Sequence, residues 1–353
     1  LVAHAILIAL AMAALFTAAL GLGGPRLYRA MGGTGAALDA AVAYSNALFA
    51  GAAAYWLFNT LGSVVRGTGN MALPAAVMLT NALVYIGLSP ALIFGWGPFP
   101  RLGIAGAAVA SVASFGLGAL ALMTFLLSGR SLVTLSLRGA RLRRALFWDI
   151  LRVGAPGALN TVLTNLTFVL LTGLVGPFGA AALAGYGMGA RLEYLMIPLV
   201  FGLGSGLVTM VGTNVGAGQG VRAERIAWVG AGLAAGVTGS IGLVAAIFPG
   251  AWLGLFSTDP DVLAAGTRYL TIVGPVYGFF GVGLALYFAS QGAGRLAWPL
   301  IAGFARLSIA ALGGWLAIHQ FGAGLSGLFV AIALALVVFG ATVVVAIRAG
   351  AWR

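Results

Sequence analysis

The nine-residue stretch RGTGNMALP, residues 66–74, returns 225 positions later as QGAGRLAWP, residues 291–299. Both stretches place two glycines, an alanine and a proline at the same spacing. A chain with 56 glycines repeats a G-x-G pair easily, so the likeness is informative only if it extends without gaps. It does extend, because the same offset aligns Tyr44 with Tyr269. The two stretches therefore mark an internal repeat.

The composition is that of a protein surrounded by lipid. Of the 353 residues, 61% are hydrophobic and 7% are charged, and the mean hydropathy is +1.09. Soluble domains carry about a quarter charged residues, so this chain has too few to cover a water-facing surface. Ten apolar stretches reach the roughly 20 residues that a membrane-spanning helix needs, which predicts an all-α polytopic membrane protein. They are 4–24, 40–65, 71–96, 104–128, 148–175, 184–213, 226–249, 263–289, 297–319 and 325–348.

The positive charge of the chain predicts its orientation. All 18 basic residues are arginines, and the net charge is +12. In a soluble protein this charge would indicate nucleic-acid binding, but twelve arginines fall in alternate breaks between the apolar stretches and three in the opposite breaks. By the positive-inside rule we expect both termini in the cytoplasm, a plasma-membrane (bacterial inner-membrane) location and no nucleic-acid partner. The twelve are Arg66, Arg130, Arg138, Arg141, Arg143, Arg144, Arg152, Arg222, Arg225, Arg295, Arg348 and Arg353, and the three are Arg26, Arg29 and Arg101.

Several kinds of active site are disfavoured by the residues present. The chain has no cysteine, and its two histidines, His4 and His319, lie near the ends of apolar runs, so we expect no metal site and no cofactor. The glycine-rich NVGAGQG, residues 214–220, lacks the lysine of a phosphate-binding loop. A membrane-embedded enzyme would need clustered acids or histidines at mid-membrane, and one acid does not make such a cluster. We therefore expect no enzyme.

The repeat predicts the domain organisation. The longest polar break begins at residue 129, so we predict a partial N-terminal lobe at 1–128 with four spans, a cytoplasmic linker at 129–147 and a C-terminal lobe at 148–353 with six spans. Halves with the same order of spans form a parallel repeat, a design found in transporters. The offset aligns residue 1 with Ile226, so the first half lacks counterparts of two spans. We expect an N-terminally truncated twelve-helix protein, with a natural ten-helix protein as the alternative.

Three segments resemble one known family. They are VRGTGNMALPAAVMLTNALVYIGLSPALIFGWGPFPRLGIAGAAVAS (65–111), LRVGAPGALN (151–160) and ALAGYGMGARLEYLMIPLVFGLGSGLVTMVGTNVGAGQGVRAERI (182–226). In this order they are similar to the third to twelfth helices of the multidrug and toxic compound extrusion (MATE) family. The resemblance implies an antiporter that exports amphipathic, often cationic compounds in exchange for H⁺ or Na⁺, by rocking of two six-helix lobes about a central cavity.

The resemblance leaves an alternative within transport. Related folds act as flippases for lipid-linked saccharides, which would favour a strongly cationic cavity, and Arg306 is the only arginine expected deep in a span. In either case we expect a monomer whose partners are membrane lipid and a small-molecule substrate. The family's coupling acids lie in its first helix, outside the present sequence, and in its seventh and tenth. The corresponding segments here offer Asn160, Asn165 and Tyr277 instead.

Ionisable side chains inside a membrane are costly and are candidates for function. Glu193 is the sole acid expected within a span and is our candidate for binding a proton or cation. Arg191 precedes it by two residues, and the alternative is a structural Arg–Glu arrangement, although side chains two apart lie on different helix faces. The repeat aligns Asn81 with Arg306, so both halves place a polar side chain at the equivalent position. These two side chains either line a cavity or form hydrogen bonds between helices.

Uncharged polar residues form two further candidate groups. The first is Asn160, Thr164 and Asn165, which share roughly one helix face and either offer ligands or connect helices. The second is an aromatic and polar wall for an amphipathic cation. Its members are Tyr55, Asn59, Tyr186 and Tyr277.

Prolines that bend helices and glycines that allow helices to pack closely both favour the rocking motion. The prolines at 156, 198 and 275 lie inside apolar runs and should bend them. The glycines of GLGSG, residues 202–206, should let helices approach closely.

Overall fold

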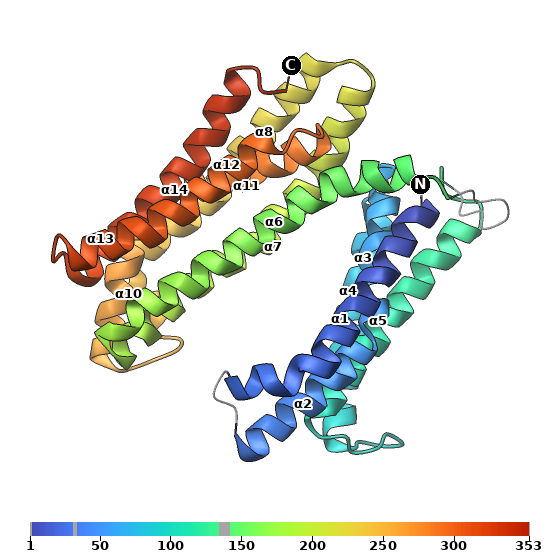
Figure 1. Ribbon diagram of the computed structural model, residues 1–353, viewed down its shortest axis with the longest axis horizontal. Helices are drawn as coiled ribbons and strands as arrows, with labels where there is room; N and C mark the ends of the chain where they lie inside the picture. The colour runs from blue at the N-terminus through green and yellow to red at the C-terminus, as the bar shows by residue number, and fades with distance from the viewer. Residues whose placement is uncertain (1, 31–33, 134–141, 353) are drawn as a thin grey trace. The chain divides into compact units, whose positions relative to one another are not determined.

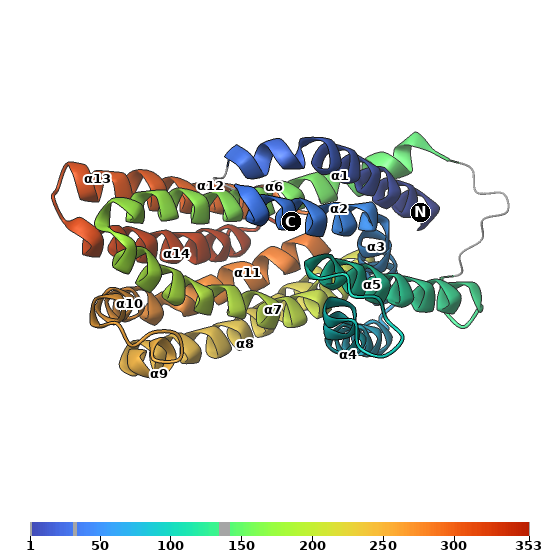
Figure 2. The ribbon, with the colours of Figure 1, turned by 90° about the horizontal axis from the view of Figure 1, so that it is seen from below.

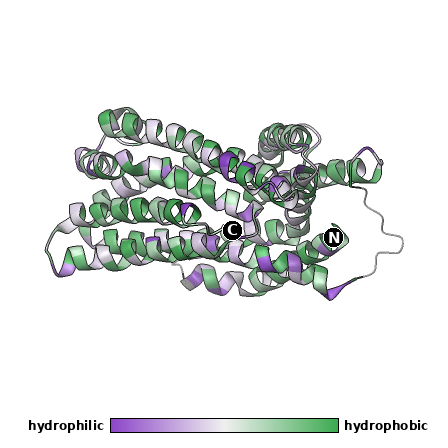
Figure 3. Ribbon diagram, turned by 90° about the horizontal axis from the view of Figure 1, so that it is seen from above, coloured by the Kyte–Doolittle hydropathy of each residue, from purple (hydrophilic) through white to green (hydrophobic). Residues whose placement is uncertain are grey.

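The computed structural model describes residues 2–30, 34–133 and 142–352, and within these ranges all regular secondary structure is helical. Nine of the described helical stretches are long and apolar enough to cross a membrane, and a bent pair of helices makes a tenth. Hydrophobic residues occupy most of these helices (Figure 3). The prediction of an all-α polytopic membrane protein is confirmed.

The chain divides into two compact units, Leu1–Ile150 and Leu151–Arg353. In the first unit α3 lies against α1 and α5, and α4 packs along α5. Its hydrophobic core surrounds Leu61 on α3 and Leu122 on α5. Its helices, blue to teal in Figure 1, are α1 (Val2–Ala30), α2 (Gly35–Ala50), α3 (Ala52–Gly67), α4 (Ala72–Phe94) and α5 (Ile104–Leu127).

The second unit is built around α11, which packs against α7, α8 and α14 (Figure 2). Helix α6 begins in the first unit and crosses into the second at Leu151. The elements are α6 (Arg144–Val175), η1 (Gly176–Phe178), α7 (Ala180–Gly216), α8 (Gly220–Ile247), α9 (Pro249–Leu253), α10 (Pro260–Val273), η2 (Gly274–Val276), α11 (Tyr277–Gly292), α12 (Ala297–Ser308), the π-helical η3 (Ile309–Gly313), α13 (Gly314–His319) and α14 (Gly324–Arg348).

The sequence repeat has a structural counterpart. Helices α3 and α11 begin 225 residues apart and end 225 residues apart, and the same offset separates the first residues of α4 and α12. The packing partners also correspond, because α3 contacts α1, α4 and α5 while α11 contacts α8, α12 and α14. The two units are therefore pseudo-symmetric bundles, as the repeat predicts.

The repeated glycine stretch forms an equivalent turn in both units. Gly69 and Gly294 adopt φ values of +87° and +68°, a left-handed conformation that favours glycine. The helix before each turn is also broken at an equivalent place. In the first unit α2 and α3 meet at Gly51 with a bend of 47°, and in the second η2 separates α10 from α11.

Some predicted boundaries were wrong. Helix α1 continues to Ala30, so Arg26 and Arg29 lie within it rather than in a break, since Pro25 does not end the helix. Helix α6 already begins at Arg144, so the end of the predicted linker forms its first turn. The part of that linker at 134–141 lies outside the described residues.

Two of the three prolines that were predicted to bend helices lie inside continuous helices. Pro156 and Pro198 are interior residues of α6 and α7, whereas Pro275 lies in η2, where the helix is interrupted.

Candidate functional site

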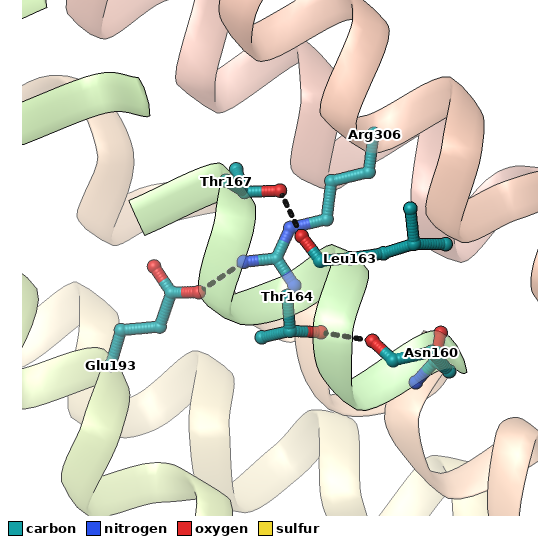
Figure 4. A network of polar contacts seen from close by, with 6 residues as sticks. All are labelled: Asn160, Leu163, Thr164, Thr167, Glu193 and Arg306. Carbon is teal, nitrogen blue, oxygen red and sulfur yellow. Dashed lines mark hydrogen bonds and ion pairs between the residues drawn. The ribbon is translucent and has the colours of Figure 1, made fainter. Parts of the chain in front are cut away.

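Among the described residues, Glu193 of α7 and Arg306 of α12 form a buried ion pair inside the second unit. The Arg306 Nη2 lies 2.6 Å from the Glu193 Oε1, and the two side chains are 8% and 2% exposed respectively. They point toward one another from different helices (Figure 4). A carboxylate and a guanidinium 113 residues apart in the sequence therefore neutralise one another in an apolar interior.

Aromatic rings surround the guanidinium. The Arg306 Cζ lies 5.3 Å from the ring centre of Phe280 on α11 and 5.7 Å from that of Phe339 on α14. At these distances the ring faces attract the cation. The guanidinium is thus held by a carboxylate and two rings.

Tyrosines surround the carboxylate. Tyr269 of α10 interacts with the Glu193 side chain, and Tyr186 of α7 and Tyr277 of α11 are buried close by. Within the described residues, the hydroxyl of Tyr186 has no hydrogen-bond partner, whereas that of Tyr277 interacts with Tyr269. Buried polar groups are nearly always paired, so an unpaired hydroxyl beside a buried acid is unusual and marks a place where a cation, a proton or water can be bound. We call Glu193, Arg306 and the three tyrosines the ion-pair cluster.

Burial makes the cluster sensitive to protonation. Two opposite charges inside an apolar bundle offset the cost of removing each from water only while both are present. Protonation of Glu193 would leave Arg306 as an uncompensated buried charge. The arrangement is therefore stable with the pair formed and becomes strained when the carboxylate takes up a proton.

Helix α6 contributes polar side chains beside the pair (Figure 4). Asn160 is buried, and its Oδ1 lies against Gly303, one helical turn before Arg306 on α12. The Thr164 hydroxyl donates to the Asn160 carbonyl at 3.0 Å, and the Thr167 hydroxyl donates to the Leu163 carbonyl at 2.7 Å. The π-helical η3 follows directly after α12, and such π segments are frequent at functional sites.

Residues 156–316, which contain both members of the ion pair, match the MatE family model. The chain belongs to the MATE family. The sequence resemblance is thereby confirmed, and the members of this family are transporters that cross the membrane many times.

Individual MATE relatives differ in the cargo that their names give. A FAD transporter of Shewanella oneidensis is 32% identical over 62% of this chain and 48% of its own length. A probable multidrug resistance protein NorM of Deinococcus radiodurans is 32% identical over 67% of this chain and 53% of its own length. The chain thus spans about half the length of these relatives.

A crystal structure of MATE in the bent conformation has the same fold. Its TM-score is 0.91 at 21% identity, and the match covers 99% of this chain and 77% of the crystallised one. The two-bundle plan described above is therefore that of the MATE fold.

The repeat places a polar residue at the position of Arg306 in the first bundle as well. Asn81 of α4 is buried, and its amide lies against Gly118 of α5. In the second MATE bundle Arg306 lies against Phe339 of α14. In the last helix of each half, GIAG at 103–106 repeats as GLSG at 324–327, an offset of 221 that aligns Gly118 with Phe339, so the two positions are equivalent. Asn81 has an amide nitrogen without a hydrogen-bond partner in the described part of the chain.

Other predicted residues lie away from the ion-pair cluster. Arg191 is exposed and lies over the ring of Phe256, so the pairing of Arg191 with Glu193 was wrong, because a spacing of two turns the side chains to different faces. Asn165 is exposed, and its amide donates to the carbonyl of Thr161 on its own helix. Asn160, Thr164 and Asn165 therefore do not act as one set of ligands.

The predicted aromatic wall is divided between the two bundles. Tyr186 and Tyr277 belong to the ion-pair cluster, whereas Tyr55 and Asn59 lie on α3 of the first unit. Tyr55 lines a cavity of about 420 Å³ together with Tyr44, and Asn59 lines a separate groove of about 670 Å³. The offset aligns Tyr44 with Tyr269 of the cluster. The first bundle thus has an open cavity where the second has packed side chains.

Sequence reasoning missed three residues that complete the site. The sequence pattern indicated Tyr269 only as a repeat match and did not single out Phe280 or Phe339. A usable signal was present for one of them, because Phe280 aligns with Tyr55, which was already a candidate. Their contacts with the ion pair depend on how five helices, α7, α10, α11, α12 and α14, pack against one another.

Proposed function

We propose that this protein exports amphipathic, cationic small molecules across the plasma membrane in exchange for H⁺ or Na⁺. The observation that carries the proposal is the buried pair of Glu193 and Arg306, with the unpaired hydroxyl of Tyr186 beside it. A relative that is 32% identical is named as a probable multidrug resistance protein, which supports the substrate class. In this proposal the two bundles rock to expose the substrate to alternate sides.

The surroundings of Glu193 favour H⁺ as the coupling ion over Na⁺. A proton needs only the carboxylate, whereas Na⁺ needs several oxygen ligands and would meet the positive charge of Arg306 at close range. Protonation of Glu193 would break the ion pair and make the closed packing unfavourable. Proton uptake would in this way promote the conformational change.

An anionic cargo is the second candidate, because another relative is named as a FAD transporter. A strongly cationic cavity would favour an anionic cargo and also the alternative function as a flippase for lipid-linked saccharides. Arg306 is neutralised by Glu193 in the second unit, so its charge is not free to attract an anion. This neutralisation favours the cationic substrate.

The arginine distribution supports a placement with both termini in the cytoplasm of a bacterial cell. We propose that the protein acts there as a monomer, in contact with membrane lipid and without a cofactor. The coupling ion is the only further ligand that this mechanism requires.

A transport assay tests the function. The complete product of the gene, reconstituted in proteoliposomes, should move a fluorescent cationic dye against its gradient when a pH gradient is imposed. A Na⁺ gradient alone should move less dye if H⁺ is the coupling ion. FAD is measured in parallel as the anionic alternative. Dye movement that is independent of both gradients would disprove antiport. Gradient-driven movement of FAD but not of the dye would show that the cargo is anionic, as in the second candidate function.

Variants of the acid connect this function to the site. Glu193→Gln cannot be deprotonated, so coupled transport should fall at least tenfold while dye binding persists. Glu193→Asp keeps the charge and should retain a measurable part of the coupling, with Asp259→Asn, at an exposed helix N-cap, as the control. Full coupled transport by Glu193→Gln would remove Glu193 from the mechanism.

A further inference from the structure

The second unit has a groove between α7 and α8 that the transport proposal does not use. Its volume is about 680 Å³. Residues at spacings of three and four on both helices line it, so it follows one face of each helix. The lining residues from α7 are Gly202, Leu203, Gly206, Leu207 and Met210, and those from α8 are Arg222, Arg225, Ile226, Val229, Gly230 and Leu233.

The groove is apolar along its length and open at its surface. Leu207 packs against Gly230 and brings the two helices into contact at its floor. Gly202 and Gly206 leave its wall empty, since a Cβ built at either position meets no atom within 4 Å. Met210, Val229 and Leu233 are each more than half exposed. A surface of this kind in a membrane protein accommodates a hydrocarbon chain.

One end of the groove is positively charged. Arg222 and Arg225 are exposed there, and among the described residues neither forms an ion pair with a carboxylate. Arg222 makes one long hydrogen bond, of 3.4 Å, to the side chain of Gln219. Two guanidinium groups at the end of an apolar groove are complementary to a phosphate ester that carries an acyl chain.

The residues around the charged end are typical of a membrane surface. Trp228 follows on α8, with the guanidinium of Arg348 5.5 Å from its ring centre, and tryptophan and arginine gather where membrane meets water. From Arg225 to Leu233 the groove extends about 12 Å along the helix, at 1.5 Å per residue. The hydrocarbon of one leaflet is about 15 Å thick, half of the roughly 30 Å core. The groove therefore matches the depth of one leaflet.

We propose that this groove binds one anionic phospholipid of the cytoplasmic leaflet. An acyl chain lies between α7 and α8 over Gly202 and Gly206, and the phosphate is held by Arg222 and Arg225. The site is independent of the transported substrate, so it stands even if the transport proposal fails. It would connect the two helices of a hairpin whose first member carries Glu193.

The test compares lipids that share acyl chains. The whole protein, purified in a neutral detergent, is titrated with palmitoyl-oleoyl phosphatidylglycerol and with the phosphatidylcholine of the same chains, and bound lipid is counted by native mass spectrometry. Arginine near a membrane surface contributes about fivefold in affinity each. Replacing both by Arg222→Gln and Arg225→Gln should therefore weaken phosphatidylglycerol binding about 25-fold and phosphatidylcholine binding little.

A second variant tests the groove itself. A Cβ at position 206 meets no atom within 4 Å, so Gly206→Leu places its side chain in the groove and should reduce the binding of both lipids at least fivefold. Arg268→Gln, an exposed arginine of α10, and Gly232→Leu, at an exposed and open position of α8 outside the groove, are the matched controls and should bind as the unaltered protein does. Thermal unfolding of each variant shows that it is folded.

Three outcomes would overturn the proposal. The first is tight phosphatidylglycerol binding by the double arginine variant. The second is an unchanged count of bound lipid in Gly206→Leu, which would show that the lipid binds to another part of the protein and not in the groove. The third is displacement of the lipid by inorganic phosphate at equal concentration, because the site would then recognise the anion without the acyl chain.

Discussion

At the scale of single residues, the chain places two opposite charges where neither could remain alone. Glu193 and Arg306 are almost completely buried, and each is the only charged partner of the other among the described residues. A buried pair stabilises a fold little compared with apolar side chains of the same size, so its presence favours a functional explanation. The unpaired hydroxyl of Tyr186 beside the pair also favours a functional explanation.

The ion pair predicts a pattern of stabilities. Glu193→Gln and Arg306→Met should each destabilise the second unit by about 3–5 kcal/mol, because each leaves the other charge buried without its partner. The double variant Glu193→Met with Arg306→Met should recover most of this loss, since it buries no charge. Thermal unfolding in detergent measures all three. Equal destabilisation by the double variant and the sum of the single ones would show that the two charges do not interact.

At the scale of secondary structure elements, the glycines of GLGSG divide into two kinds. Gly204 of α7 is buried, and a Cβ there would collide with the ring of Phe288 on α11. Gly202, two residues earlier, faces open space. Only one of these glycines therefore permits the close approach of α7 and α11 that the sequence predicts for the whole stretch.

This difference predicts opposite effects of the same substitution. Gly204→Ala should destabilise the protein by about 1–3 kcal/mol, the usual cost of overpacking. Gly202→Ala should leave it unchanged or stabilise it by up to about 1 kcal/mol, because alanine favours a helix where space allows. The two melting temperatures, measured side by side in detergent, decide the matter. A lower stability of Gly202→Ala than of Gly204→Ala would contradict the packing described for α7.

At the scale of the whole molecule, the parallel repeat requires equivalent turns to lie on one side of the membrane. Ala72 and Ala297 begin equivalent helices, α4 and α12, after the two glycine turns, and both are exposed. Thr34 and Thr258 lie just before α2 and α10, at the other end of their bundles. The arginine count assigns the first pair of positions to the cytoplasm and the second to the outside.

The absence of cysteine from the sequence makes this topology directly measurable. In inside-out vesicles a membrane-impermeant maleimide should label the Ala72→Cys and Ala297→Cys variants, and in right-side-out cells it should label Thr34→Cys and Thr258→Cys. Labelling of Ala72→Cys and Ala297→Cys from opposite sides would contradict the parallel repeat. Reversal of all four would leave the repeat intact and contradict only the orientation.

The sequence by itself determined the number of spans, their approximate bounds and the division into two repeated bundles. These properties follow from local quantities, namely the length of apolar runs and the spacing of repeated residues, and the offset of 225 reproduced the ends of α3 and α11. The predicted helix ends were wrong where a helix continues through polar residues or proline, as α1 does past Pro25. The sequence also identified Glu193 and Arg306 as the important charges, because ionisable residues are rare in its apolar runs.

Only the tertiary structure decided which of these charges meet. Arg191, two residues from Glu193, points elsewhere, whereas Arg306, 113 residues away, binds the carboxylate at 2.6 Å. The rotation of each helix about its axis selects the side chains that face one another, and this rotation is set by packing between helices. For the same reason Tyr269 and the groove between α7 and α8 emerge only in three dimensions. The lengths of the apolar runs determine that this chain forms a bundle of membrane helices, and the packing of those helices determines which side chains form a site inside it.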